Sequence, residues 1–271
     1  MSMVWSPDYL GSPGKMVLAK DYIHGPADPD VAAYIAAVET ADGQGLEEEV
    51  KAAYSNFITG CKADGIWDAI KASCILAGAR TLDGALVSLV GTAPTKFGTA
   101  ANWNYNRKTG LQGDGSTNYL DSNRNNNADP QNSNHNSVYV STAQSPGNTG
   151  FYIDSGSNGT GANNFGRSAV SGNLFLRNRC DTGTTIASGA AIGFMGHSRN
   201  QSNQYVFRVT GSNTTVNIAS QLPANGTLTL FARTLFYSDA RIAFYSIGES
   251  LDLALLDTRV STLISDLGAA I

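Results

Sequence analysis

The chain has 271 residues, enough for one large domain with or without a small appendage, and its 42% of apolar residues can form a sizeable core. Only 15% of residues are charged, and the formal net charge is −4. Residues 100–250 carry a net charge of about +3, which is too weak for a surface that follows nucleic-acid phosphates. No run of residues is long and apolar enough for membrane insertion. We therefore expect neither nucleic acid nor a membrane as a partner.

Residues 1–27 are predicted to form an extended N-terminal arm. Prolines and glycines prevent a long element there, yet the segment contains Trp5, Tyr9 and Tyr22. Such residues favour docking, either back onto the arm's own domain or onto another subunit or a larger particle. A disordered tail is the third alternative.

Residues 28–80 are predicted to form a small helical subdomain, because apolar residues recur there with a period near 3.6. Predicted helices cover residues 28–43, 46–65 and 66–77. The first begins at an Asp-Pro-Asp start signal, and the third places Ile66, Ile70, Cys74 and Ala77 on one face. Short apolar pieces in residues 81–100 predict a linker.

From about residue 103 the apolar period changes to two, which indicates strands separated by Gly, Asn and Ser turns. Predicted strands cover residues 117–121, 136–142, 149–154, 164–169, 173–179, 191–197, 204–210, 213–219, 227–233 and 240–248. Residues 101–250 are therefore predicted to form a β-sandwich. Residues 251–271 carry a continuous apolar stripe and predict a helix that packs on the sandwich or on a neighbouring subunit. The fold class is thus mainly β: an antiparallel sandwich with a small N-terminal helical subdomain and a C-terminal helix.

One polar segment has the alternating oxygen-bearing residues with which a calcium loop begins. Asp121, Asn123 and Asn125 occupy every second position. An EF-hand would need Gly where Asn126 stands and a bidentate Glu where Asn132 stands, so this is not an EF-hand. A looser calcium site at Asp121, Asn123 and Asn125 is one alternative. The favoured one is a polar loop whose side chains satisfy the local backbone, with no cofactor.

Aromatic rings next to amide and guanidinium groups suit sugars, which have apolar ring faces and a rim of hydroxyls. Trp103 and Tyr105 lie beside Arg107 in an Asn-rich stretch, and Asn125 and Asn127 lie in the polar segment. We predict these five residues as ligand contacts. The competing interpretation has Trp103 filling one end of the sandwich.

Two stretches resemble a known family. Gly110-Leu-Gln-Gly-Asp-Gly-Ser-Thr-Asn-Tyr-Leu-Asp121 resembles the opening strand pair, and Ala243-Phe-Tyr-Ser-Ile-Gly-Glu-Ser-Leu251 the closing strand, of concanavalin A-like lectin/glucanase jelly rolls found in bacteriophage structural proteins. The preceding helices, with Asp64-Gly-Ile-Trp67 and Ile70-Lys-Ala-Ser-Cys74, resemble the helical lead-in often fused to such modules.

The resemblance implies a non-enzymatic structural component of a phage-like particle: a tail or head fibre, spike or decoration protein. Its lectin-like domain would bind host-surface carbohydrate. The implied partners are other virion proteins and copies of the chain itself, and homotrimers are common in such parts. The resemblance also implies the virion as the location. The start of the chain lacks the charged-then-apolar order of a secretory signal, so we expect synthesis in the bacterial host cytoplasm.

The alternative function is a polysaccharide-degrading glycosidase of the same fold class. Glucanases of that class need carboxylates spaced by two on one strand, so that they share a face. The chain has no Glu-x-Asp-x-Glu run, and Glu249 is the only Glu in residues 100–250. His24, His135 and His197 follow no nucleophile-elbow sequence. We therefore expect no catalytic residues; Glu249 or Asp121 would be the ones to test.

Overall fold

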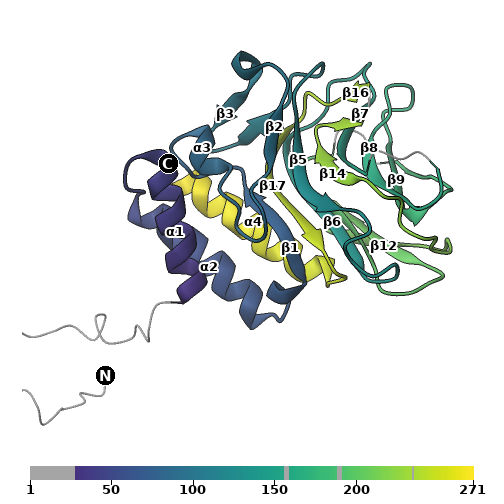
Figure 1. Cartoon of the computed structure of the whole chain (residues 1–271), viewed down its shortest axis with the longest axis horizontal. Helices are drawn as coiled ribbons and strands as arrows, with labels where there is room; N and C mark the ends of the chain where they lie inside the picture. The colour runs from purple at the N-terminus through teal and green to yellow at the C-terminus, as the bar shows by residue number, and fades with distance from the viewer. Residues whose placement is uncertain (1–27, 156–158, 188–190, 234) are drawn as a thin grey trace, which may run out of the picture.

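The computed structural model describes residues 28–155, 159–187, 191–233 and 235–271, and the predicted arm at residues 1–27 lies outside them. The described chain forms two antiparallel β-sheets packed face to face, with helices against one of them (Figure 1). The predicted mainly β sandwich with a C-terminal helix is therefore confirmed.

The first sheet, sheet A, has eight strands. Seven follow the order β13 (Ser212–Val216), β12 (Tyr205–Val209), β11 (Gly193–Arg199), β6 (Asn134–Thr142), β17 (Arg241–Gly248), β4 (Gly110–Gln112) and β3 (Asn104–Asn106). The eighth, β1 (Ile70–Ile75), pairs with β17. The long pair β6–β17 forms the middle of the sheet.

The second sheet, sheet B, has seven strands. Their order is β10 (Thr184–Ile186), β9 (Leu174–Cys180), β8 (Ala162–Arg167), β7 (Gly150–Asp154), β14 (Thr227–Leu230), β5 (Tyr119–Asn125) and β2 (Thr95–Phe97). A two-stranded sheet of β15 (Ala232–Arg233) and β16 (Phe236–Tyr237) follows β14 in the chain.

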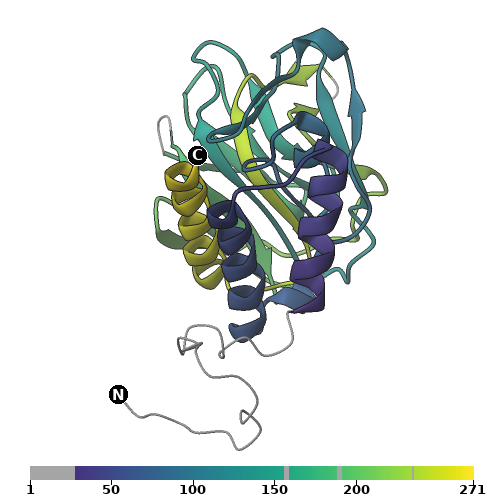
Figure 2. The same ribbon diagram turned by 90° about the vertical axis from the view of Figure 1, so that its left-hand side faces the viewer.

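Three long helices, α1 (Pro29–Asp42), α2 (Glu48–Ala63) and α4 (Leu253–Ala270), lie side by side against sheet A (Figure 2). Local signals explain their ends. The carboxylate of Asp28 accepts hydrogen bonds from the first backbone N–H groups of α1, and Gly43 ends that helix with φ 68°. Asp252 caps α4 in the same way. The shorter elements are α3 (Leu82–Ala85) and the 3-10 helices η2 (Trp67–Ala69) and η3 (Ala100–Asn102).

The buried side chains form two cores on either side of sheet A. The inter-sheet core fills the sandwich with residues such as Leu120, Val138 and Phe207. The helix-side core joins Phe244 and other residues of sheet A to the stripes of α1, α2 and α4. The C-terminal helix therefore packs on the sandwich of its own chain. None of the described helices is long and apolar enough to cross a membrane.

The predicted third helix, residues 66–77, is wrong. Residues Ile70–Ile75 form β1, and Cys74 lies opposite Tyr245 of β17. β1 is buried on both faces: Ala72 and Cys74 reach the inter-sheet core, and Ile70 and Ile75 the helix-side core. Ile66, Ile70 and Cys74 recur every four residues, as on a helix face, while Ile70-Lys-Ala-Ser-Cys74 equally fits the alternation of a strand, so the spacing alone did not decide between the two.

Candidate functional site

Sheet B turns one face to the inter-sheet core and leaves aromatic rings on the other. Leu120 of β5 is fully buried in the core, so Tyr119 and Asp121, which flank it, point to the opposite, outer face. The neighbouring edge strand β2 continues this pattern, because Phe97 lies opposite Tyr119 and Thr95 lies opposite Asp121. The outer face therefore carries a row of rings beside a row of polar groups.

The rings form two touching groups on this face. Phe97 and Tyr119 are stacked, with ring centroids 4.8 Å apart and planes 6° apart, and Tyr237 lies 6.5 Å from Tyr119. Next to Tyr237 in β16, Phe236 contacts Phe151 at 6.3 Å, and Phe151 contacts Phe175 at 4.8 Å. These six residues are termed the aromatic strip. Phe97 is 41% exposed and Phe236 46%, whereas Phe151 is only 2% exposed, so each group presents one open ring. The ring of Phe97 is the one that lies beside the polar pair Thr95 and Asp121.

The hydroxyl of Tyr119 is available for a ligand. Burial raises the pKa of Tyr119, and the neighbouring Tyr237 and Asp121 raise it further, so the hydroxyl stays protonated at neutral pH. Within the described residues, no hydrogen bond occupies this hydroxyl. It can therefore donate to, or accept from, a polar group placed on the strip.

The side chains predicted as calcium ligands hold strands together. Asp121 accepts hydrogen bonds from the backbone N–H of Asn123 and from the hydroxyl of Thr227, both at 2.8 Å. Nδ2 of Asn123, a residue with φ 56°, donates to the carbonyl of Ala93 at 2.7 Å. Asn125 is exposed at the end of β5. No group of three or more His, Cys, Asp or Glu that could hold a metal ion occurs in the described ranges, and the looser calcium site stays a prediction.

The structure does not bring the five predicted ligand contacts together. Trp103 packs edge-on against Phe231 of the inter-sheet core at 6.1 Å, which is the end-filling position of the competing interpretation. The hydroxyl of Tyr105 donates to the carbonyl of Ala79 at 2.6 Å. These contacts lie at the β3 edge of sheet A.

Arg107 is a structural tie between a β-hairpin and a helix. Its Nη2 donates to the carboxylate of Glu47 at 2.7 Å, and its Nε donates to the carbonyl of Gly78 at 3.2 Å. Asn125 and Asn127, by contrast, are exposed at the far end of β5 in sheet B. The guanidinium group of Arg107 is therefore already occupied by contacts within the chain. A binding role for Asn125 and Asn127 stays a prediction.

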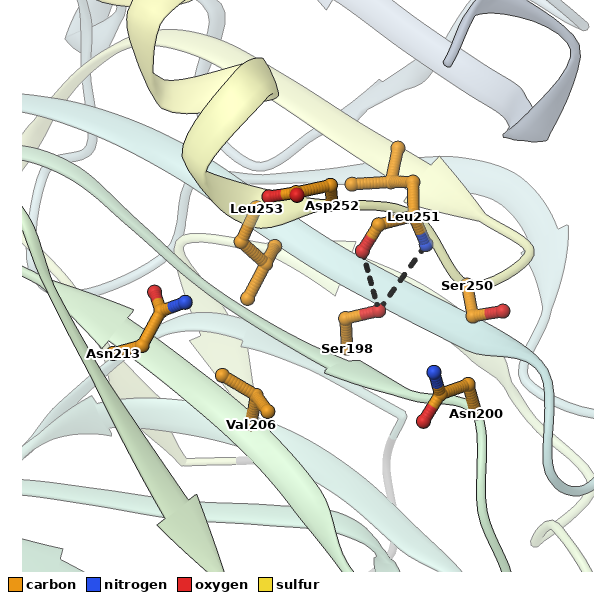
Figure 3. Close-up of a pocket in the computed structure, with 8 residues that line it drawn as sticks. All are labelled: Ser198, Asn200, Val206, Asn213, Ser250, Leu251, Asp252 and Leu253. Atoms are coloured by element: carbon orange, nitrogen blue, oxygen red, sulfur yellow. Dashed lines mark hydrogen bonds between the residues drawn. The ribbon is translucent and has the colours of Figure 1, made fainter. Parts of the chain in front are cut away.

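A second candidate surface is an open pocket of about 420 Å³ between α4 and the β11–β13 end of sheet A (Figure 3). Its lining is mostly small and polar: Ser198, Asn200, Val206, Asn213, Ser250, Leu251, Asp252 and Leu253. Among these residues, Oγ of Ser198 donates to the carbonyl of Leu251 at 2.9 Å and accepts from its N–H at 3.2 Å. The volume suits a small ligand, but none of the lining residues is aromatic.

A smaller pocket, of about 270 Å³, lies beside the end of α2. It is lined by Asp30, Lys62, Gly65, Trp67 and Asp68. The ammonium group of Lys62 lies 5.6 Å from the centroid of the Trp67 ring and also pairs with Asp30. Because a paired cation lies over the ring, this pocket offers a less accessible aromatic face than the strip does.

Phe97, Tyr119 and Thr95 were missed as site residues at the sequence level. The alternation of Tyr119 and Asp121 in one strand is a usable signal, since both must share a face. Phe97 carries no such signal. It joins the site only because β2 pairs with β5, a contact between segments separated by a turn-rich stretch.

No protein-family model and no curated protein match the chain. Solved structures do match in fold. One is of botulinum neurotoxin type C, described as interacting with two ganglioside molecules (16% identity, TM-score 0.52, 72% of this chain and 51% of that chain). Another is the binding domain of botulinum neurotoxin DC in complex with rat synaptotagmin II (15% identity, TM-score 0.53, 72% of this chain and 52% of that chain). A third is the same binding domain in complex with SialylT (16% identity, TM-score 0.51, 74% of this chain and 52% of that chain). The match thus spans about half of those chains, and at such identity the likeness shows the fold alone.

Proposed function

We propose that the chain is a non-enzymatic carbohydrate-binding protein and that the Phe97 end of the aromatic strip is its sugar contact. One observation carries the proposal. A stacked pair of rings, Phe97 and Tyr119, stands partly exposed on the outer face of sheet B, in register with the polar pair Thr95 and Asp121.

The dimensions of this surface suit a sugar ring. Residues two apart on one strand face are separated by about 7 Å, so Tyr119 and Asp121 are spaced by about the width of a pyranose. The apolar C–H face of the sugar packs on the exposed ring of Phe97. Its hydroxyls reach the carboxylate of Asp121, which has acceptor capacity beyond its two internal hydrogen bonds, and the hydroxyl of Tyr119.

Two further facts support a binding role for this fold. The surface composition is polar with few charges, which suits a neutral polyhydroxylated ligand. Two of the matched structures are described with a ganglioside or with SialylT, and the third is described as a binding domain. These descriptions apply to those proteins, and here they only make carbohydrate the first ligand class to test.

The non-enzymatic part of the proposal rests on how the carboxylates are used. Asp114 accepts three backbone N–H groups of its own turn, and Asp129 pairs with Arg124. Glu249 pairs with Lys71 at 3.1 Å, next to β17 of sheet A, whereas Asp121 lies on the outer face of sheet B. Glu249 and Asp121 therefore do not form the facing pair that glycoside hydrolysis requires.

A glycan array tests the proposal. The full chain is applied to an array of neutral and acidic glycans, together with the variants Phe97→Ala and Phe97→Tyr. We expect wild type and Phe97→Tyr to bind the same glycans, since both keep a ring, and Phe97→Ala to lose them.

The pocket of Figure 3 supplies the matched control, Asn213→Ala. Binding that is lost in Asn213→Ala and kept in Phe97→Ala would transfer the sugar site to that pocket. Binding of no glycan by the wild type would overturn the carbohydrate proposal as a whole.

We also propose a narrower role, that of a structural component of a phage-like particle. Its sequence resemblance to jelly-roll modules of bacteriophage structural proteins suggests this role. The stretches from Gly110 to Asp121 and from Ala243 to Leu251 support it. Mass spectrometry of purified particles is the test. The chain should be present in stoichiometric amounts with the other virion proteins, and its absence from the particles would contradict this role.

A further inference from the structure

One end of the inter-sheet core is polar instead of apolar. Six polar residues lie there, and the relative exposure of each is at most 1%. They are Asn134, Asn136, Asn163, Asn178, His197 and Arg199, termed the polar core. Asn136 and His197 lie opposite each other on β6 and β11, and both point between the sheets, because Val138 and Met195, two residues away on these strands, belong to the inter-sheet core.

Several polar atoms of this cluster lack a hydrogen-bond partner within the described chain. They are both side-chain atoms of the Asn136 amide, both ring nitrogens of His197, Nδ2 of Asn178 and Oδ1 of Asn163. Leaving a buried donor or acceptor unpaired costs about 1–3 kcal/mol each. Asn178 lies close to Asn136, because Nδ2 of Asn134, two residues from Asn136 on the same strand face, donates to Oδ1 of Asn178 at 3.1 Å. Native proteins satisfy such groups with water or an ion, so these neighbouring unpaired groups point to a bound species.

The charge around this position is positive. Among the described residues at this end of the core, Arg124, Arg179 and Arg199 accompany Asp129, which pairs with Arg124 and whose backbone carbonyl accepts from Arg179. Within the part of the chain that the structure describes, Arg199 donates to an amide oxygen and to backbone carbonyls and to no carboxylate. Burial, and then the charge of Arg199, lower the pKa of His197 to about 3, so its ring is neutral. Asp129 is thus shared between Arg124 and Arg179, and these three guanidinium groups and one carboxylate sum to a charge of +2, which is unfavourable in a low dielectric.

We propose that the polar core binds one chloride-sized monovalent anion, held by N–H groups of Asn136, Asn178 and His197. The anion takes up unpaired donors and offsets the positive field of Arg179 and Arg199, whose own N–H groups are directed to carbonyl oxygens. A cation is disfavoured by the same field. The unpaired amide oxygens of Asn136 and Asn163 need donors, which water beside the anion supplies.

Two measurements on the full chain test this site together. Crystals soaked in sodium bromide should show an anomalous peak between β6 and β11, beside Asn136 and His197. Unfolding in urea is measured at constant ionic strength, with chloride replacing gluconate. At chloride concentrations well above the dissociation constant of the site, each tenfold rise in chloride should make the equilibrium constant of unfolding tenfold smaller, as the release of one anion on unfolding requires.

The variant Asn136→Leu should remove this chloride dependence, whereas the surface variant Asn213→Ala should keep it. If Asn136→Leu does not fold, the bromide peak and the chloride slope of the wild type decide the matter. Water alone at the position, with no anomalous signal, overturns the proposal, and so does an unfolding constant that is independent of chloride.

Discussion

The guanidinium group of Arg199 donates to the backbone carbonyl of Asn178 twice, from Nε at 3.2 Å and from Nη2 at 2.9 Å. Nη1 donates to the carbonyls of Gln201 and Gln204 at 3.1 Å, and Nη2 also donates to that of Ile218 at 3.1 Å. One fully buried side chain thereby joins β9 of sheet B to the turn after β11 of sheet A.

Replacing Arg199 by Met should lower the free energy of unfolding by at least about 3 kcal/mol, because several buried carbonyls lose their donor at once. Urea unfolding followed by circular dichroism measures this. Lys96→Met is the control, since Lys96 forms an exposed pair with Asp83 at 3.1 Å and its loss should cost less than about 1 kcal/mol. An Arg199→Met chain as stable as the control would show that the carbonyl cluster contributes little.

The buried histidines should make the protein less stable in mild acid. Burial lowers the pKa of His135 to about 4 and that of His197 to about 3, whereas the unfolded chain binds protons below about pH 6.5. The unfolded state therefore binds more protons, and stability falls from pH 6.5 downward by about 1.4 kcal/mol per pH unit for each histidine.

Urea unfolding between pH 7 and pH 5 measures this slope. The variant His197→Phe, which keeps a ring beside Phe165, should reduce the slope by the contribution of one histidine. Equal slopes for the two proteins would mean that His197 is protonated in the folded state or exposed to solvent.

Trp103 should matter for stability and not for sugar binding. Its ring packs at 6.1 Å from Phe231 at one end of the sandwich, so Trp103→Ala should lower the free energy of unfolding by about 2–4 kcal/mol. The glycan profile of the folded variant should equal that of the wild type. A folded, stable Trp103→Ala chain that loses glycan binding would favour the original hypothesis that Trp103 contacts the ligand.

The sequence pattern predicted the sandwich because burial alternates along strands such as β12 and β14, although the central strands β6 and β17 are buried at most positions. Each predicted strand overlaps a strand of the structure, and the C-terminal helix, Leu253–Ala270, lies within the predicted residues 251–271. The pattern failed at β1, which it assigned to a helix, and it missed the short strands β2, β3, β4, β10 and β16. Ile70-Lys-Ala-Ser-Cys74 of β1 does alternate apolar and polar residues, but Ile66, Ile70 and Cys74 also recur at helical spacing, so period alone cannot decide between strand and helix. The three residues of β2 are too few to show a period.

The candidate site was less predictable than the fold. Aromatic residues near Asn and Arg predicted Trp103 and Tyr105 as sugar contacts, yet both pack inward or bond to the backbone. The residue types that flank an aromatic residue in the sequence do not determine whether its ring points into the core or toward solvent. Phe97 and Tyr119 become a pair only through the β2–β5 register, which depends on contacts across the whole sheet.

The central claim is that the exposed ring of Phe97 contacts sugar. Isothermal titration of the best array glycan into wild type, Phe97→Tyr and Phe97→Ala tests it most directly. We predict that Phe97→Ala binds at least about tenfold more weakly, which corresponds to a loss of about 1.4 kcal/mol, while its urea midpoint stays close to that of the wild type. Equal dissociation constants for the three proteins would contradict the claim.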